Sequence, residues 1–317
     1  MNRDNIITTM LMVAFMVSLW GCQMEKQIRR PSQEELFEKM RRNFLPEAQT
    51  FQVYPGTDTN LTGLQGTEIA ISKETFATLS EREPITIELE EYFDIGTMLM
   101  ANLSTTSKGT PLETGGMVGI AISQNNMELK EPFEIKISIP ILIENSDMNY
   151  YYGLTDSIDI QWQMASNPDS GSEESLDLSE VPIDSTGGDL LNYIQMGEYR
   201  WFNKDLPLEF SKIGSFSALV DNSNSDAILY IVLEDYNTIF PAVIARNKKV
   251  EFSNVPVGEK AVIVGLWFDE EEQISYLLED ITINESEIEL SEFIASDKQE
   301  IQEILKQKFN RSIAIRK

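Results

Sequence analysis

The side chains that could do chemistry in this sequence are almost all carboxylates. The 317 residues include 52 Asp and Glu, one Cys and no His. Without His the usual general base near neutral pH is missing, which excludes Ser-His-Asp catalysis, Cys-His catalysis and histidine-ligated zinc. A single Cys excludes an internal disulfide and a thiolate cluster. Composition does allow a pair of carboxylates, so a carboxylate-dependent glycan hydrolase is an alternative function.

Motifs that bind phosphate, dinucleotides or metals are absent or incomplete. The sequence contains no G-x-G-x-x-G, no G-x-x-x-x-G-K-[ST] and no G-x-S-x-G. Residues 221–226, D-N-S-N-S-D, begin like a calcium loop, but the sixth position is not Gly and the twelfth is Val232 instead of Glu. The acidic run at residues 269–272 is typical of a solvated hairpin tip. We therefore expect no cofactor and no metal site; a calcium-stabilised adhesin is a second alternative.

The charge of the chain restricts its partners. With 25 Lys and Arg against 52 Asp and Glu, the net charge is −27. Such a surface repels the phosphates of nucleic acids, so no nucleic-acid partner is expected. It also repels anionic lipid, so membrane association needs a source other than electrostatics.

The only cysteine, Cys22, follows an apolar run of fifteen residues at positions 6–20. The run is shorter than the ~20 residues of a membrane span and is typical of a signal peptide. Residues 19–22, L-W-G-C, resemble the lipobox of bacterial lipoproteins, although Trp20 is atypical there. The resemblance implies cleavage before Cys22, attachment of two or three palmitate-like acyl chains to Cys22, and a membrane anchor. By the same resemblance Gln23 favours the outer membrane. The alternative is a plain signal peptide or an anchor helix with an incidental cysteine.

Hydrophobic periodicity predicts a mainly β fold: two antiparallel β-sandwich-like domains with a short N-terminal helix and a C-terminal helix. Runs such as I-T-I-E-L-E at residues 85–90 alternate apolar and polar residues, as expected for strands with one buried face. The predicted order is a signal peptide at 1–21, a tether and short helix at 22–49, a β-domain at 50–164, a linker or mobile loop at 165–189, a second β-domain at 190–295, and a C-terminal helix and tail at 296–317.

The predicted N-terminal helix follows a capping box formed by Ser32 and Glu35. It carries basic residues, Lys39, Arg41 and Arg42, towards its C-terminal end. These either complement the helix dipole or contact lipid headgroups beside the anchor. The predicted C-terminal helix has an apolar stripe at Ile301, Ile304, Leu305 and Phe309, which favours docking on a sheet over binding a partner.

Three stretches of the sequence resemble known proteins. Residues 61–76 and 85–92 are similar to the opening of ZU5-like β-domains, with Ser72 where that pattern has Pro. The other stretches are residues 98–107 with 112–117, and residues 199–205 with 229–237. Together the three stretches resemble a family of uncharacterised cell-envelope lipoproteins found in Bacteroidota. The resemblance implies a ZU5-like N-terminal β-domain; such domains act elsewhere as protein-interaction modules, and fold does not establish function.

The segment E-Y-R-W-F-N-K-D at residues 198–205 mixes aromatic and charged residues without clean periodicity. Tyr199, Trp201 and Asp205 are therefore candidates for a binding surface, the alternative being a domain junction. Ser157 and Ser185 each follow Asp in a short pattern that resembles the O-glycosylation sequon of Bacteroidota. Together these observations predict a lipid-anchored envelope protein without enzymatic activity that scaffolds or binds protein or glycan at the membrane surface.

Overall fold

The computed structural model describes residues 30–309 except for positions 81, 130–132, 134, 141–147, 156–159, 166–189, 192–199, 222–223, 225, 247, 270 and 285–286. Residues 33–317 form one compact unit, distinct from residues 1–32. The account below concerns the described part of that unit. Within it no helix is both long enough and apolar enough to cross a bilayer.

The N-terminal β region consists of two packed sheets. The larger has the order β1-β4-β6-β12-β9-β10, with β5 and β7 paired to β6, and the smaller has the order β11-β8-β3-β2. The strands are β1 (Gln49–Val53), β2 (Thr59–Thr62), β3 (Glu68–Ile71), β4 (Ile85–Tyr92), β5 (Thr106–Ser107), β6 (Thr110–Gln124), β7 (Met127–Glu128), β8 (Ile135–Ser138), β9 (Asn149–Thr155), β10 (Ile160–Met164), β11 (Leu190–Leu191) and β12 (Trp201–Pro207). All their pairings are antiparallel.

The period-two pattern of the sequence explains why these sheets pack face to face. Ile85, Ile87 and Leu89 of β4 alternate with more exposed residues and enter one hydrophobic cluster. Ile69 of β3 and Ile137 of β8 enter the same cluster from the smaller sheet. Alternate side chains point to one face of a strand, so this cluster is the interior of a sandwich.

The C-terminal β region also consists of two sheets. One has the order β17-β13-β20, and the other has the order β15-β14-β18-β19-β21 with β16 paired to β14. The pairing of β13 with β20 is parallel, and the other pairings are antiparallel. The elements are β13 (Ile213–Leu219), β14 (Ile228–Leu233), the 3-10 helix η3 (Glu234–Tyr236), β15 (Thr238–Ile239), β16 (Val243–Ile244), β17 (Lys249–Pro256), β18 (Lys260–Phe268), β19 (Ile274–Thr282), β20 (Ile288–Glu289) and β21 (Ile294–Ser296).

Strand β14 is apolar at every position because both of its faces are buried. Ile228, Tyr230 and Val232 enter one hydrophobic cluster, whereas Leu229, Ile231 and Leu233 enter the cluster between the two C-terminal sheets. A strand covered on both sides has no solvent face, so its sequence loses the alternation that other strands show.

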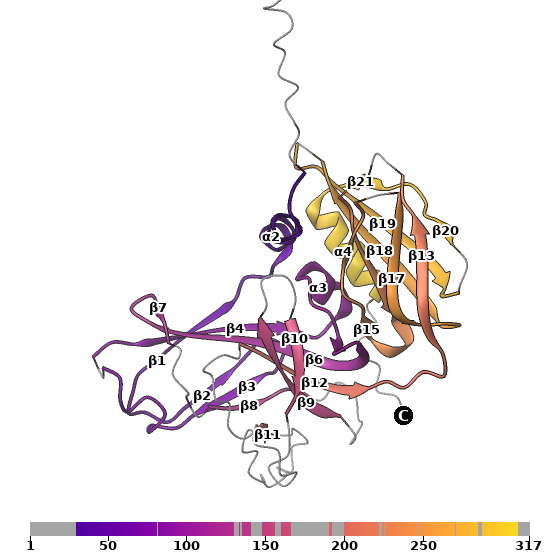
Figure 1. Cartoon of the computed structure of the whole chain (residues 1–317). Coiled ribbons are helices and arrows are strands. Elements are labelled where there is room, and N and C mark those ends of the chain that lie inside the picture. The colour runs from indigo at the N-terminus through magenta and orange to yellow at the C-terminus, as the bar shows by residue number, and fades with distance from the viewer. Residues whose placement is uncertain are drawn as a thin grey trace, which may run out of the picture. The chain divides into compact units, whose positions relative to one another are not determined.

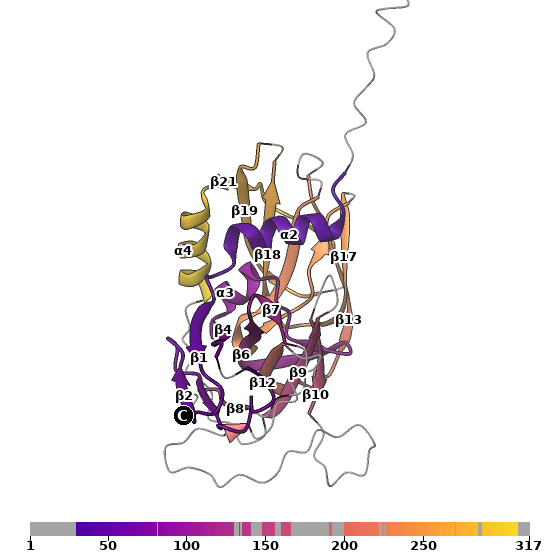
Figure 2. The same cartoon turned by 90° about the vertical axis from the view of Figure 1, so that its left-hand side faces the viewer.

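Three helices cover the outer face of the sheet that contains β14. They are α2 (Gln33–Phe44), α3 (Ile95–Met100) and α4 (Lys298–Phe309). Their buried residues, among them Met40, Leu99 and Leu305, share a cluster with Tyr230 of β14 and Val264 of β18. In Figure 1 α4 lies against β18 and β19, and Figure 2 shows all three helices on this side of the sheet. The apolar stripes of α2 and α4 therefore pack inside the protein.

The predicted fold class is confirmed: the protein is mainly β, with antiparallel sandwich-like sheets, a short N-terminal helix and a C-terminal helix. Strand pairing nevertheless crosses the predicted boundary at residue 190. Strand β11 pairs with β8, and β12 lies between β6 and β9, so both extend the N-terminal sheets. The boundary was placed by composition, and composition does not encode which distant strand a segment joins.

Candidate functional site

Two of the three residues predicted to form a binding surface are buried. Strand β12 has a neighbour on each side, and both of its faces are covered, leaving Trp201 9% and Asp205 0% exposed. The Trp201 ring packs against that of Tyr92, with centroids 5.6 Å apart. Trp201 and Asp205 thus correct the prediction of an exposed surface, because the segment is an internal strand. Tyr199 lies outside the described residues.

The predicted modification sites also lie outside the described residues. Cys22, the predicted lipidation site, and Ser157 and Ser185, the predicted O-glycosylation sites, all fall in stretches that the structure leaves undescribed. The same holds for residues 166–189 of the predicted linker. These predictions rest on the sequence alone.

Asp205 belongs to a buried polar cluster where β6 meets β12. The register passes from Asn203↔Met117 to Asp205↔Thr114, so β6 has one extra residue and bulges. Thr114 Oγ1 donates to Asn203 Oδ1 at 3.1 Å, and Asn203 Nδ2 donates to Asp205 Oδ2 at 2.6 Å. All three side chains are completely buried. The cluster brings a hydroxyl, an amide and a carboxyl into contact away from water.

Two glycines in the bulge make room for this cluster. A Cβ on Gly115 would lie 2.8 Å from the carbonyl oxygen of Lys204, and a Cβ on Gly116 would lie 2.2 Å from the Phe93 ring. Gly116 also has a φ of +129°, which side-chain-bearing residues rarely adopt. The glycines therefore allow the chain to bulge and the Phe93 ring to cover it.

Burial sets the ionisation of the cluster. Burial raises the pKa of Asp205 well above its usual value, while hydrogen bonds from the Thr114 side chain and the Gly115 backbone act in the opposite direction. Tyr151, on the neighbouring strand β9, has a pKa raised to about 12 by burial and by the nearby Asp205. Because desolvation disfavours the charged form, burial favours the neutral form of the Asp205 carboxyl.

A second buried carboxyl, Glu91 at the end of β4, has a different environment. Its oxygens accept from Gln49 Nε2 at 2.7 Å, from the Gln65 amide at 2.9 Å and from the Thr67 amide at 3.0 Å. The Gln65 and Thr67 amides belong to the turn that joins β2 to β3, so Glu91 ties the smaller N-terminal sheet to the larger. A Cβ on Gly63 would lie 2.6 Å from this carboxylate, which explains the glycine in that turn.

Next to Glu91, Glu90 forms a partly exposed ion pair. Arg200 Nη2 lies 3.1 Å from Glu90 Oε1, and Tyr92 Oη donates to Glu90 Oε2 at 3.4 Å. Burial, followed by the charge of Glu90, raises the pKa of Tyr92. This group holds the aromatic pair of Tyr92 and Trp201 in place and adds no exposed reactive side chain.

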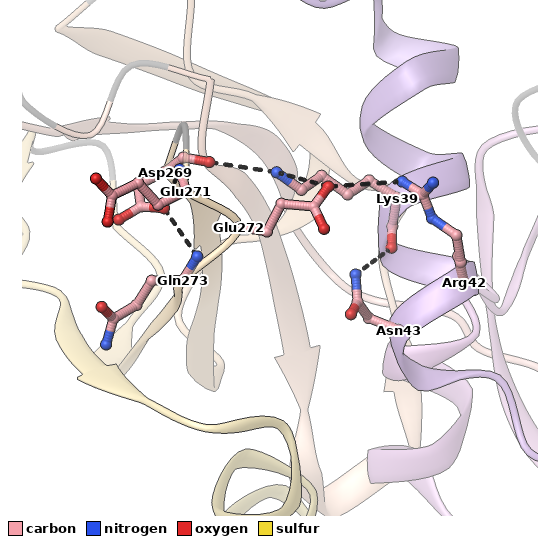
Figure 3. Close-up of polar contacts among 7 residues, drawn as sticks. All are labelled: Lys39, Arg42, Asn43, Asp269, Glu271, Glu272 and Gln273. Atoms are coloured by element: carbon pink, nitrogen blue, oxygen red, sulfur yellow. Dashed lines mark hydrogen bonds and ion pairs between the residues drawn. The ribbon is translucent and has the colours of Figure 1, made fainter.

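The basic side of helix α2 contacts the hairpin between β18 and β19, as Figure 3 shows. Lys39 Nζ donates to the Asp269 carbonyl oxygen at 3.3 Å and lies 5.2 Å from the centre of the Phe268 ring. Glu272 Oε1 lies 4.0 Å from both Lys39 Nζ and Arg42 Nη2. Lys39, with its side chain 18% exposed, is thus used within the fold, whereas Arg42 is 71% exposed and still faces solvent.

The acidic stretches considered for calcium have other contacts. Asp269 Oδ1 accepts from the Glu271 and Gln273 amides and so closes the hairpin turn. Asp226 forms a salt bridge with Arg246. Within the described residues no group of three or more Asp, Glu or Cys is arranged to hold a metal ion.

Sequence reasoning missed the roles of Glu91, Thr114 and Asn203. Glu91 had a usable signal: it interrupts an alternating strand at a position that should face inward. The adjacent Gly115 and Gly116 inside an otherwise apolar strand also indicate a bulge. Thr114 and Asn203 are 89 positions apart, and no local pattern connects them.

Comparison with known proteins gives no lead to function: no family model, no curated protein and no solved structure matches this chain.

Proposed function

We propose that this chain is a lipid-anchored protein of the bacterial cell envelope, on the outer membrane, whose folded part binds or scaffolds a protein or glycan and does not turn over substrate. The observation that carries the proposal is Cys22, the single cysteine of the chain, at the end of L-W-G-C behind an apolar run of signal-peptide length. Two or three acyl chains attached at one cysteine suffice for stable anchoring.

The position of the folded unit along the chain supports the proposal. Helix α2 begins at Gln33, eleven positions after Cys22. Even fully extended, eleven residues span at most about 40 Å, so an anchored chain would keep its fold close to the bilayer. The contacts of α2 with α3 and α4 mean that a pull on the anchor would act on the core directly.

The two buried carboxyl groups of the N-terminal sheets are poor candidates for the acids of a glycan hydrolase. Glu91 is engaged by three donors of the fold, and Asp205 is completely buried. A glycan hydrolase needs two carboxyl groups that reach an external substrate in a cleft. Neither group is placed to reach an external substrate.

Lipid attachment is tested by labelling cells that express the full chain with a palmitate analogue. The wild type is expected to take up label and to sediment with membranes, and Cys22→Ser is expected to do neither. The matched control combines Cys22→Ser with Met24→Cys, which keeps one cysteine but moves it from the motif, and should also stay unlabelled. Undiminished label in Cys22→Ser would refute the anchor.

The binding role is tested separately by crosslinking the anchored protein in cells and identifying what co-purifies. Loss of the same partner in the Cys22→Ser strain would show that the partner is met at the membrane. Turnover of any sugar polymer by purified protein would instead favour the hydrolase.

A further inference from the structure

The cluster at the β6 bulge contains an acid with an unused oxygen. Asp205 Oδ2 accepts from Asn203, but among the described residues Asp205 Oδ1 has no hydrogen-bond partner, although Asp205 is completely buried. A buried polar atom without a partner destabilises a fold, and networks that serve only structure satisfy their members. The carboxyl group at this position therefore calls for a chemical explanation.

The partners of Asp205 make up a reactive set. Thr114 supplies a hydroxyl within one hydrogen bond of the Asn203 amide, at 3.1 Å from its oxygen. The nitrogen of that amide lies 2.6 Å from Asp205. The fold thus holds three groups together away from water: a nucleophile, an electrophilic carbonyl carbon and an acid that contacts the leaving nitrogen. Such fixed geometry lowers the entropic part of a reaction barrier.

We propose that Thr114 and Asn203 form an intramolecular ester bond, with Asp205 as the proton-transfer catalyst. Thr114 Oγ1 bonds to Cγ of Asn203, the bond from Cγ to Nδ2 breaks, and one ammonia leaves. Asp205 gives its proton to the departing nitrogen and takes the hydroxyl proton of Thr114, so the acid is regenerated. The step consumes no oxidant, metal or second substrate, and each chain reacts once.

Both the catalyst and its surroundings suit this reaction. The raised pKa of Asp205 keeps its proton available for the leaving nitrogen. The Phe93 ring packs over the bulge at Gly116, and excluding water protects an ester from hydrolysis once it has formed. The bond would join two central strands of the larger N-terminal sheet.

A cross-link between Thr114 and Asn203 would stabilise the fold in the way that a disulfide does in other proteins. With one cysteine, no internal disulfide is possible. A covalent bond between Thr114 and Asn203, 89 positions apart, closes a long loop, and closing long loops restricts the unfolded chain most.

Peptide mass spectrometry of the purified full chain decides the proposal. Trypsin cuts after Lys108, Lys130, Arg200 and Lys204, which separates residues 109–130 from the tetrapeptide W-F-N-K at 201–204. The expected species is the two peptides joined, with a mass lower by one ammonia than their sum. Hydroxylamine, which cleaves esters, should release the tetrapeptide. Recovery of both peptides only as separate, unmodified species from folded wild-type protein would overturn the proposal, whatever the variants do.

Variants assign the roles. Thr114→Val removes the nucleophile with little change of volume, and Asp205→Asn removes the acid; each should give only separate peptides. Thr114→Ser should keep the joined species, as should the control Thr110→Val, an exposed position on the same strand. Loss of the bond in Thr114→Val should lower Tm by about 10 °C relative to wild type. A joined species that persists in Thr114→Val would show that the bond is made elsewhere and would overturn the assignment.

Discussion

Two buried carboxyl groups in the N-terminal sheets have opposite environments. Glu91 sits in a cage of three donors contributed by β1 and by the turn between β2 and β3. Asp205 accepts from Asn203 Nδ2 at Oδ2, has Oδ1 without a partner among the described residues, and has a pKa that burial raises despite hydrogen bonds from Thr114 and Gly115. Because a satisfied carboxyl holds a structure together and an unsatisfied one costs stability, the fold uses Glu91 as a tie and tolerates Asp205 at a reactive cluster.

The largest effect is expected on the satisfied side. Glu91→Ala should lower the free energy of unfolding by about 3–4 kcal/mol, because three donors lose a carboxylate acceptor and two of them are backbone amides of one turn. Urea denaturation measures the change. Glu88→Ala, an exposed position on the same strand, is the matched control and should cost about 0.5 kcal/mol or less. Equal losses of unfolding free energy in Glu91→Ala and Glu88→Ala would show that Glu91 does not hold the sheets together.

A smaller effect is expected at the bulge that holds Asp205. Gly116→Ala should destabilise the fold by about 2–3 kcal/mol, since its Cβ would overlap the Phe93 ring and its φ is +129°. The control is Gly56→Ala, where φ is +80° but no atom lies within 4 Å of the added carbon. That variant should lose only about 1 kcal/mol, the cost of its backbone conformation. Thermal unfolding of both variants would show whether the packing around Phe93 accounts for the difference.

The contribution of Asp205 to stability should also depend on pH. The pKa of Asp205 is higher in the folded than in the unfolded chain, so the folded state holds the proton more tightly. The resulting stabilisation is complete below about pH 4 and is lost as pH rises towards the folded-state pKa. The stability of wild type relative to Asp205→Asn should therefore fall with rising pH. Asp205→Asn also removes the proposed cross-link, which should lower its stability by the same amount at every pH. Stability-against-pH curves that run parallel for wild type and Asp205→Asn would contradict a raised pKa of Asp205 in the folded state.

The smallest effect is expected at the exposed ion pair of Arg42 with Glu272 (Figure 3). Arg42→Ala should change stability by only about 0–0.5 kcal/mol, because Arg42 is 71% exposed and lies 4.0 Å from Glu272. Lys39→Ala should cost more, about 1 kcal/mol, since Lys39 also donates to the Asp269 carbonyl and covers the Phe268 ring. Double-mutant cycles with Glu272→Ala would separate the ion pairs from this packing and set the lower end of the scale.

How far the sequence predicts the molecule depends on the distance over which a feature is encoded. Helix α2 and the alternating strand β4 were predictable because caps and periodicity act over a few residues. The place of β12 in the sheet was not, since pairing with β6 and β9 spans most of the N-terminal region. The burial of Trp201 and Asp205 is hidden from the sequence for the same reason: a mixed aromatic and charged segment looks exposed until its neighbours on both sides are known.

Strand β14 has a consequence for how the protein melts. Its even- and odd-numbered side chains lie in two separate hydrophobic clusters. One cluster is shared with the helices, and the other lies between the two C-terminal sheets. Unfolding the elements on one side alone would expose one apolar face of β14 to water, which makes partial unfolding unfavourable. Heating should therefore disrupt both interiors together, in a single calorimetric peak.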